Sequence, residues 1–376
     1  FPDGMGGIGL FPMSPCYVVN LTDVKATLGS IDVSYNTINI PVSGAGMYVS
    51  NWASVMNQGL TDVIIGEVRV TENNMNVSNT GLTFEYRGVG YELHDESTIY
   101  HDNITIQMND ITSGDDAIEI SGFSIGENLY DNSAVTIGDF YVMDNVINSG
   151  NEGIYLEYYD VGIELHNNSI FKTGDIICAY NDISSGGDGI YMEMFNIGYN
   201  VYGTSQVIFS SVSVIENQID ADGDGIDLND LSDWGTYLGD SSSFSMDSIK
   251  VNDNTITSGY DGISCYIGYF AYYMNDNTPG QSSFSMENFE FCRNLIDSSD
   301  YGYYFDDVED FGEEMYNEST ASFGDFLVNE NDITSIDDGI YFNDDLCAYI
   351  GYYIGDNATV TFGDIEVNYN TVVSDS

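Results

Sequence analysis

An asparagine recurs along this chain every 36 to 40 residues, within the pattern apolar-x-x-Asn-x-Ile, which usually continues to Gly-Ile from the eighth residue onward. The pattern is clearest at 142–154, 214–226, 251–263 and 328–340. Ten anchors at such regular spacing indicate one repeat array, in which each unit buries its apolar face only by stacking on its neighbours. The anchor asparagines are Asn36, Asn73, Asn109, Asn145, Asn181, Asn217, Asn254, Asn294, Asn331 and Asn370.

Each repeat unit has the composition of β-strands. Its segments are rich in Val, Ile, Phe, Tyr and Thr, and Gly, Asn, Asp and Ser separate them. No window keeps a 3.6-residue apolar period, so helices are not expected. We therefore predict an all-β fold, a parallel β-solenoid of about ten coils with a repeat of about 37 residues, over residues 31–376. The alternative is a β-propeller, but propellers typically have four to eight blades.

Stacked coils would place the ten asparagines above one another as an internal amide ladder, each side chain bonding to those on either side. Residues 1–30 are rich in Gly, Pro and Met where they begin, and we expect them to form an N-terminal extension that serves assembly.

The Asn-x-Ile…Asp-Gly-Ile pattern resembles the repeats of right-handed parallel β-helix proteins of the pectate-lyase-like superfamily, from Asp32 to Ser374. Coils of that superfamily are usually much shorter, so we expect a different coil shape here. The superfamily includes lyases, hydrolases, epimerases, phage spikes and surface proteins, so the resemblance implies a solenoid without assigning a function. A chain this acidic, poor in lysine and bearing sequons is most similar to archaeal envelope proteins, including sheath proteins.

Charge excludes several classes of partner. The chain has 61 acidic and 6 basic residues, for a formal net charge of −55. Six scattered basic residues cannot form the basic stripe that nucleic acids or anionic membranes require. No apolar run is long enough for a membrane-spanning helix. We expect cations, salt or glycans to offset the self-repulsion, and we expect the protein to lie outside the cell, at the cell surface.

One acidic segment predicts a calcium site. Asp220, Asp222 and Asp224 match the first half of an EF-hand loop, and Gly follows them at the sixth position. Leu231 replaces the glutamate expected at the twelfth position, so a different shell would have to complete the site. The alternative is an acidic, solvated turn like those of the sister repeats. The candidate ligands for Ca²⁺ or another divalent cation are Asp220, Asp222, Asp224, Asp227 and Asp230. No organic cofactor is expected.

The sharpest enzymatic candidate is the segment 112–118, where Asp115 and Asp116 resemble the Gly-Asp-Asp element of polygalacturonase-type glycosidases. Sister repeats carry one or two aspartates in the same place, which indicates repeat geometry. The companion Gly-His-Gly and Arg-Ile-Lys elements are absent. We therefore expect no catalytic residues. The alternative is a polysaccharide-active β-helix enzyme or a carbohydrate-binding adhesin.

N-glycosylation sequons indicate an extracellular protein as well. Three of them lie 13 or 14 residues before an anchor asparagine, which places them at a shared turn where a glycan would not clash with the core. The candidate glycosylation sites are Asn20, Asn76, Asn103, Asn167, Asn317 and Asn357.

The five cysteines show no CxxC pair and no cluster with histidine, so structural zinc is not expected. If four of them pair internally, one remains for another chain, and Cys16 is the candidate for an intermolecular disulfide. The alternative is that all five are buried thiols.

Thirty tyrosines concentrate after the Gly-Ile step of the repeat. They form either a platform for sugars or partners, or an aromatic ladder along the column with hydroxyls toward solvent. We favour the ladder, with subunit contact as a large part of its role.

The two ends of the array favour self-assembly. The chain stops six residues after Asn370 without a capping helix, and an open solenoid end is a row of unpaired strand edges. We therefore predict a non-enzymatic structural subunit of an extracellular polymer, such as a surface layer, sheath or filament. Its main partner would be further copies of itself.

Overall fold

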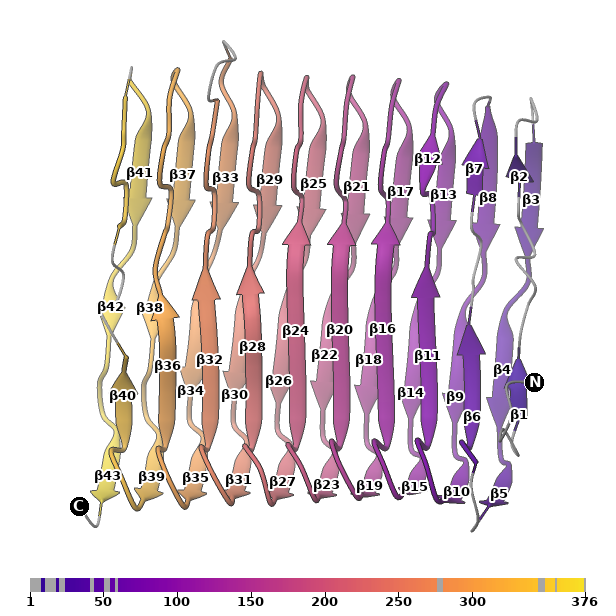
Figure 1. Cartoon of the computed structure of the whole chain (residues 1–376), viewed down its shortest axis with the longest axis vertical. Coiled ribbons are helices and arrows are strands. Elements are labelled where there is room, and N and C mark those ends of the chain that lie inside the picture. Colours follow the sequence, from indigo (N-terminus) through magenta and orange to yellow (C-terminus); the bar gives the residue numbers. More distant parts are fainter. Residues whose placement is uncertain are drawn as a thin grey trace.

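The chain forms a parallel β-solenoid of about nine turns with a repeat of about 36 residues, so the all-β solenoid expected from the repeat is confirmed. The turns lie side by side as a regular column (Figure 1). The described part of the chain contains no helix, and hence none that could cross a membrane. The computed structural model describes residues 8–10, 18–19, 24–40, 44–50, 55–57, 60–275, 280–343, 349–355 and 357–374.

Four parallel sheets of ten strands form the walls, and each turn visits sheets C, D, E and A in that order. Sheet C contains β3 (Val24–Leu28), β8 (Thr61–Ile65), β13 (Thr98–His101), β17 (Ala134–Ile137), β21 (Ile170–Thr173), β25 (Gln206–Phe209), β29 (Ser243–Met246), β33 (Ser283–Met286), β37 (Thr320–Phe323) and β41 (Thr359–Phe362). Sheet D contains β4 (Ile31–Ser34), β9 (Val68–Thr71), β14 (Ile104–Gln107), β18 (Phe140–Met143), β22 (Ile176–Ala179), β26 (Val212–Ile215), β30 (Ile249–Asn252), β34 (Phe289–Cys292), β38 (Phe326–Leu327) and β42 (Ile365–Glu366).

Sheets E and A complete each turn, and a three-stranded sheet B lies beyond sheet A at the N-terminal end. Sheet E contains β5 (Thr37–Ile40), β10 (Asn74–Val77), β15 (Asp110–Thr112), β19 (Val146–Ser149), β23 (Asp182–Ser185), β27 (Gln218–Ala221), β31 (Thr255–Ser258), β35 (Leu295–Ser298), β39 (Asp332–Ser335) and β43 (Thr371–Ser374). Sheet A contains β1 (Ile8–Leu10), β6 (Met47–Ser50), β11 (Leu82–Arg87), β16 (Ile118–Ile125), β20 (Ile154–Val161), β24 (Ile190–Ile197), β28 (Ile226–Ser232), β32 (Ile263–Gly268), β36 (Tyr303–Val308) and β40 (Ile340–Phe342). Sheet B contains β2 (Val18–Val19), β7 (Val55–Asn57) and β12 (Glu92–Leu93).

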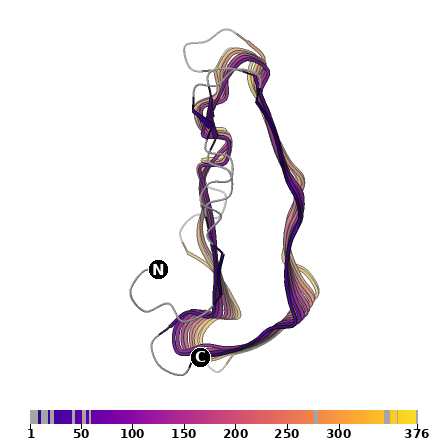
Figure 2. The same ribbon diagram turned by 90° about the vertical axis from the view of Figure 1, so that its right-hand side faces the viewer.

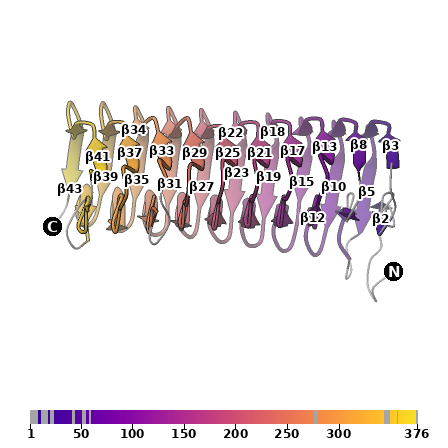
Figure 3. The ribbon, with the colours of Figure 1, turned by 90° about the horizontal axis from the view of Figure 1, so that it is seen from above.

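Each turn is a long, flattened loop when the column is viewed along its axis (Figure 2). Sheets C and D form one long wall, sheet A forms much of the other, and sheet E closes one end. The first and last turns lie at opposite ends of the column (Figure 3). Three strands from the first 30 residues already belong to the column, because β1, β2 and β3 pair with β6, β7 and β8.

In-register pairing stacks like side chains on like, and this builds the core. Along sheet E the second residue of almost every strand points inward and its neighbours point outward, as the two-residue period of a strand requires. Apolar side chains therefore form a continuous buried column, which removes their surface from water along the length of the solenoid. The column contains Ile38, Met75, Ile111, Ile147, Ile183, Ile219, Ile256, Ile296 and Ile333.

The corner between sheets D and E has the same backbone conformation in every turn. The residue immediately before each anchor asparagine has a φ between 54° and 60°, in the left-handed region that non-glycine residues adopt at a cost of about 1 kcal/mol or more. Hydrogen bonds of the asparagine that follows offset this cost. The residues in the left-handed conformation are Tyr35, Glu72, Met108, Asp144, Tyr180, Glu216, Asp253, Arg293, Glu330 and Tyr369.

The anchor asparagines form one continuous hydrogen-bonded row from Asn36 to Asn370. In the middle of the row, the backbone N–H and the Nδ2 of Asn217 both donate to Oδ1 of Asn254, each at 3.0 Å. The same Nδ2 donates to the carbonyl oxygen of Cys178 in the preceding turn at 2.9 Å. Each amide between the two ends of the row therefore ties three turns together. The Tyr303 hydroxyl joins the row by donating to Asn331 Oδ1 at 2.9 Å.

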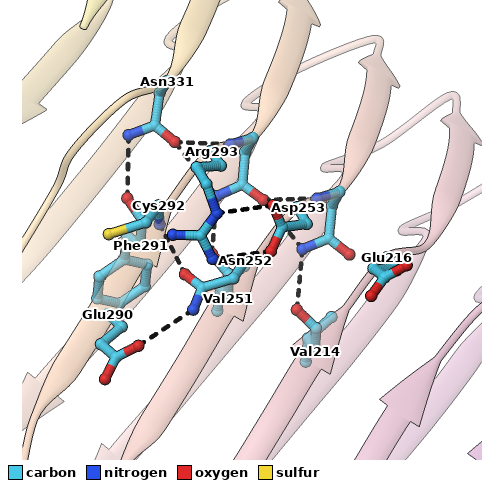
Figure 4. A network of polar contacts seen from close by, with 12 residues as sticks. Val214, Glu216, Val251, Asn252, Asp253, Glu290, Phe291, Cys292, Arg293 and Asn331 are labelled. Atoms are coloured by element: carbon cyan, nitrogen blue, oxygen red, sulfur yellow. Dashed lines mark hydrogen bonds and ion pairs between the residues drawn. The ribbon is translucent and has the colours of Figure 1, made fainter. Parts of the chain in front are cut away.

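Charged groups reinforce the outside of the corner near the C-terminal end (Figure 4). The guanidinium of Arg293 donates two hydrogen bonds of 2.8 Å to the carboxylate of Asp253 in the preceding turn. Beside it, Asn252 Oδ1 accepts the backbone N–H of Cys292 at 2.8 Å. Since both charged groups are about half exposed, this pair contributes at most about 1 kcal/mol. The buried asparagine row is the main polar feature of the corner.

Candidate functional site

The outer face of sheet A combines carboxyl groups with tyrosines, and we call it the sheet A face. Pairing without a shift between β11, β16, β20 and β24 places equivalent side chains above one another. The first outward column contains Thr83, Glu119, Tyr155, Tyr191 and Asp227, and the second contains Glu85, Ser121, Glu157, Glu193 and Asn229.

A row of carboxyl groups precedes this face, in the turn between sheets E and A. Asp188 Oδ1 accepts the backbone N–H of Asp224 at 2.8 Å, and Asp224 Oδ1 accepts that of Asp261 at 2.9 Å. Asp116 Oδ1 likewise accepts the N–H of Glu152 at 3.3 Å. Each carboxyl group thus bridges two turns. We call Asp116, Glu152, Asp188, Asp224 and Asp261 the acidic row.

Burial, with added repulsion between neighbouring carboxylates, raises the pKa of several carboxyl groups in and beside this row. Burial, followed by the negative charges of Asp224 and Asp188, raises the pKa of Asp227 to about 8. Burial also raises the pKa of Asp224 to about 7, with smaller contributions from neighbouring aspartates. The pKa of Glu152 rises to about 8 through burial and its contact with Asp116. At neutral pH, Glu152, Asp224 and Asp227 therefore keep a large share of their protons, whereas carboxyl groups in water would be ionised.

The tyrosines of the sheet A face stack on one another. The rings of Tyr155 and Tyr191 lie 5.0 Å apart with an interplanar angle of 1°. The Tyr191 hydroxyl accepts a hydrogen bond from Asn229 at 2.7 Å and donates one to Glu193 at 2.9 Å. Because Tyr155 and Tyr191 each cover one face of the other, a sugar ring cannot lie between them without displacing one of the two. This arrangement favours the aromatic-ladder interpretation of the tyrosines.

The two aspartates singled out for glycosidase chemistry occupy the turn of the acidic row. Asp115 is exposed, while Asp116 accepts a hydrogen bond from Asn151 Nδ2 at 2.9 Å. The corresponding turns of later coils carry carboxyl groups in the same arrangement, so the geometry is shared along the column.

The structure spreads the five predicted calcium ligands over a strand, a turn and a second strand. Asp220 lies on the exposed side of β27, Asp222 and Asp224 lie in the following turn, and Asp227 and Asp230 belong to β28. Within the part of the chain that the structure describes, no three His, Cys, Asp or Glu side chains gather so that they could hold a metal ion. The calcium site remains a prediction.

The predicted glycosylation sites occupy different surroundings. Asn76 is exposed on β10, whereas Asn103 Oδ1 accepts a backbone N–H from the next turn at 2.9 Å. Asn20 lies outside the described residues. The turn that precedes sheet C holds the other three sites with φ between 52° and 68°, namely Asn167, Asn317 and Asn357.

The described cysteines are buried free thiols on three different strands, Cys178 on β22, Cys265 on β32 and Cys292 on β34. Burial raises the pKa of Cys178 to about 12, which keeps this thiol protonated and unreactive. Cys16, the candidate for an intermolecular disulfide, and Cys347 lie outside the described residues.

A column of alternating histidine and tyrosine was missed in the sequence. His94, Tyr130, His166 and Tyr202 stack with centroid distances of 4.7, 5.0 and 5.4 Å and interplanar angles of 15° or less. The signal is present as Glu-Leu-His at 92–94 and 164–166, alternating with Asn-x-Tyr at 128–130 and 200–202. It has a period of two turns, so a search for a one-turn repeat overlooks it.

Comparison with known protein families, with curated proteins and with solved structures gave no match to this chain. The solenoid and its surfaces are therefore the basis for the function proposed below.

Proposed function

We propose that this chain is a non-enzymatic structural subunit of an extracellular polymer, a surface layer, sheath or filament, assembled by stacking solenoids end to end. The supporting observation is the exposed edge of the last described turn. Val372 is 45% exposed, whereas Ile333, which occupies the same register one turn earlier, is fully buried. A further turn of the same kind fits this edge, and we propose that a second copy supplies it.

The polarity of the asparagine row supports a head-to-tail contact. Within the row, each asparagine offers donors toward the C-terminal end and an acceptor toward the N-terminal end. Among the described residues, no group donates to Asn36 Oδ1 and none accepts the backbone N–H of Asn370. Stacking two copies in the same direction pairs these groups, whereas head-to-head stacking brings like groups together.

The distribution of chemical groups supports a structural role over an enzymatic one. Similar hydrogen bonds from a carboxylate to the backbone of the next turn recur along the acidic row, and Tyr155 and Tyr191 stack across two successive turns. An enzyme concentrates its strained and unpaired groups at one place, and that place interrupts the repeat. Asn167 and Asn357 are exposed in the sequon turn, which is compatible with a glycosylated protein at the cell surface.

End-to-end assembly predicts a specific loss in one variant. The purified chain of 41.4 kDa is expected to give light-scattering masses of several multiples of that value, and filaments or sheets by electron microscopy. V372D places a charge in the proposed contact and should leave monomers. V146D changes a 53% exposed residue on the side of the column and should still assemble. A particle of 41.4 kDa from the unchanged chain would overturn the proposal.

We also propose that divalent cations stabilise the column, because they would offset the net charge of −55. Ions that bind only the folded state raise its stability by mass action. At low ionic strength, a chelator is then expected to lower the Tm, and added Ca²⁺ should restore it beyond the effect of monovalent salt at equal ionic strength. An unchanged Tm after chelation would rule this out.

A further inference from the structure

The interior of the solenoid contains a polar side chain for which the described residues provide no hydrogen-bond partner. Thr173, the last residue of β21, is 7% exposed, and its Oγ1 is buried without a hydrogen-bond partner. Ile137 and Phe209 occupy the same register in the turns before and after it, so the position faces the apolar core. An isolated hydroxyl there costs free energy unless something bonds to it.

A small cavity is lined in part by Thr173. It offers about 20 Å³ to the centre of a water-sized sphere, which is enough for one water molecule and for nothing larger. Its lining is mostly apolar, but Tyr158 contributes a second polar side chain from the opposite wall in sheet A, and two glycines expose their backbone. The lining includes Phe140, Tyr158, Phe171, Thr173, Gly138 and Gly174.

Polar side chains also occupy these two registers in an earlier turn. Tyr86 and His101 lie two turns before Tyr158 and Thr173, and their rings are 5.3 Å apart. Tyr86 Oη and His101 Nε2 are likewise buried without a hydrogen-bond partner in the described part of the chain. Gly122 lies between the two tyrosines, and a Cβ there would approach the ring of Tyr158 to 2.8 Å. Polar side chains therefore occur twice, two turns apart, at the same pair of interior positions.

We propose that the cavity is a binding site for one structural water molecule, which joins the Thr173 hydroxyl to the Tyr158 hydroxyl across the interior between sheets C and A. The water accepts or donates at each hydroxyl, so the buried Thr173 hydroxyl regains a hydrogen bond and the Tyr158 hydroxyl gains one. It thereby links the two long walls of the flattened coil at a point where only apolar contacts would otherwise hold them. This site is independent of assembly.

The direction in which a single substitution changes the Tm tests the proposal. T173V preserves the shape of the side chain but removes the hydroxyl. If the hydroxyl holds water, T173V lowers the Tm by a few degrees, because the water loses a partner while Tyr158 stays buried. If the hydroxyl is merely isolated, T173V raises the Tm, since a buried polar group without a partner has been removed. T320V, on the exposed side of β37, measures the general effect of this exchange on a strand of the same sheet.

Two further measurements complete the test. Y158F should lower the Tm as well, and the double variant should lose less than the sum of the two single losses, because both hydroxyls bind the same water. A crystal structure at high resolution should show ordered density within hydrogen-bond distance of Thr173 Oγ1. A raised or unchanged Tm for T173V relative to T320V, or a site without density, would overturn the proposal.

Discussion

Replacing Asn217 by leucine is expected to lower the free energy of unfolding by at least about 3 kcal/mol. The substitution removes the acceptor of the backbone N–H of Asn181, at 3.0 Å, and of its Nδ2, at 2.9 Å. It also removes the donor to the carbonyl oxygen of Cys178. Each buried group left without a partner costs about 1–3 kcal/mol. Urea denaturation followed by circular dichroism measures the loss as a lower transition midpoint.

A matched control distinguishes the effect of losing an asparagine in the buried row from the effect of losing any asparagine. Asn148 lies on the exposed side of β19, the strand of sheet E that begins directly after Asn145. N148L is expected to change the midpoint little, because its side chain remains in water. If N217L and N148L had equal midpoints, the asparagine row would contribute nothing to stability. Because repeat arrays can unfold in parts, midpoints and slopes should be compared together.

Lowering the pH from about 8.5 to about 5 is expected to raise the Tm, on the order of 5 °C. The folded pKa values of Asp227 and Glu152 are raised to about 8 and that of Asp224 to about 7, whereas unfolded carboxyl groups titrate near pH 4. Between these limits the folded chain binds more protons than the unfolded chain. Stability must therefore fall as the pH rises through this window, and it is regained on acidification.

An amide substitution isolates the contribution of one group. D227N replaces a carboxyl by a neutral side chain of the same size, so it should raise the Tm at pH 8 and flatten the pH profile. D220N removes a charge from the exposed side of β27 and should change the profile little. Differential scanning calorimetry across the pH range at fixed ionic strength measures both variants. A Tm that increases with pH, or an identical response of D227N and D220N, would contradict the origin of the effect in buried carboxyl groups.

The repeat could be read from the sequence because the inward positions are strictly constrained. Isoleucine at the buried position of sheet E and glycine before sheet A recur, since a Cβ at Gly189 would lie 2.5 Å from a carbonyl oxygen of the next turn. This regularity predicts the stacking and the fold class. The left-handed residue before each asparagine was not predictable. Its side chain points outward, so its type varies between turns and includes tyrosine, glutamate, methionine, aspartate and arginine.

The candidate site was harder to predict for a related reason. Outward columns such as Tyr155 over Tyr191 form only when neighbouring strands pair without a shift, and the sequence does not state the register. The same ambiguity affected the aspartates after Asp220. The loop motif does not state that these aspartates belong to β27, the following turn and β28. Burial of Asp227 depends on side chains from adjacent turns, which are about 36 residues away in sequence.

The regular stacking of turns has a mechanical consequence. All backbone hydrogen bonds between turns run along the axis of the column, so a pull on the two ends of the chain loads them one turn at a time. A turn released from an end adds about 36 residues of slack, which is on the order of 120 Å of extended chain. The remaining turns keep their contacts, because each depends only on its neighbours. Under tension such a column would lengthen in equal steps, absorbing work at each step while the rest of the wall stays intact.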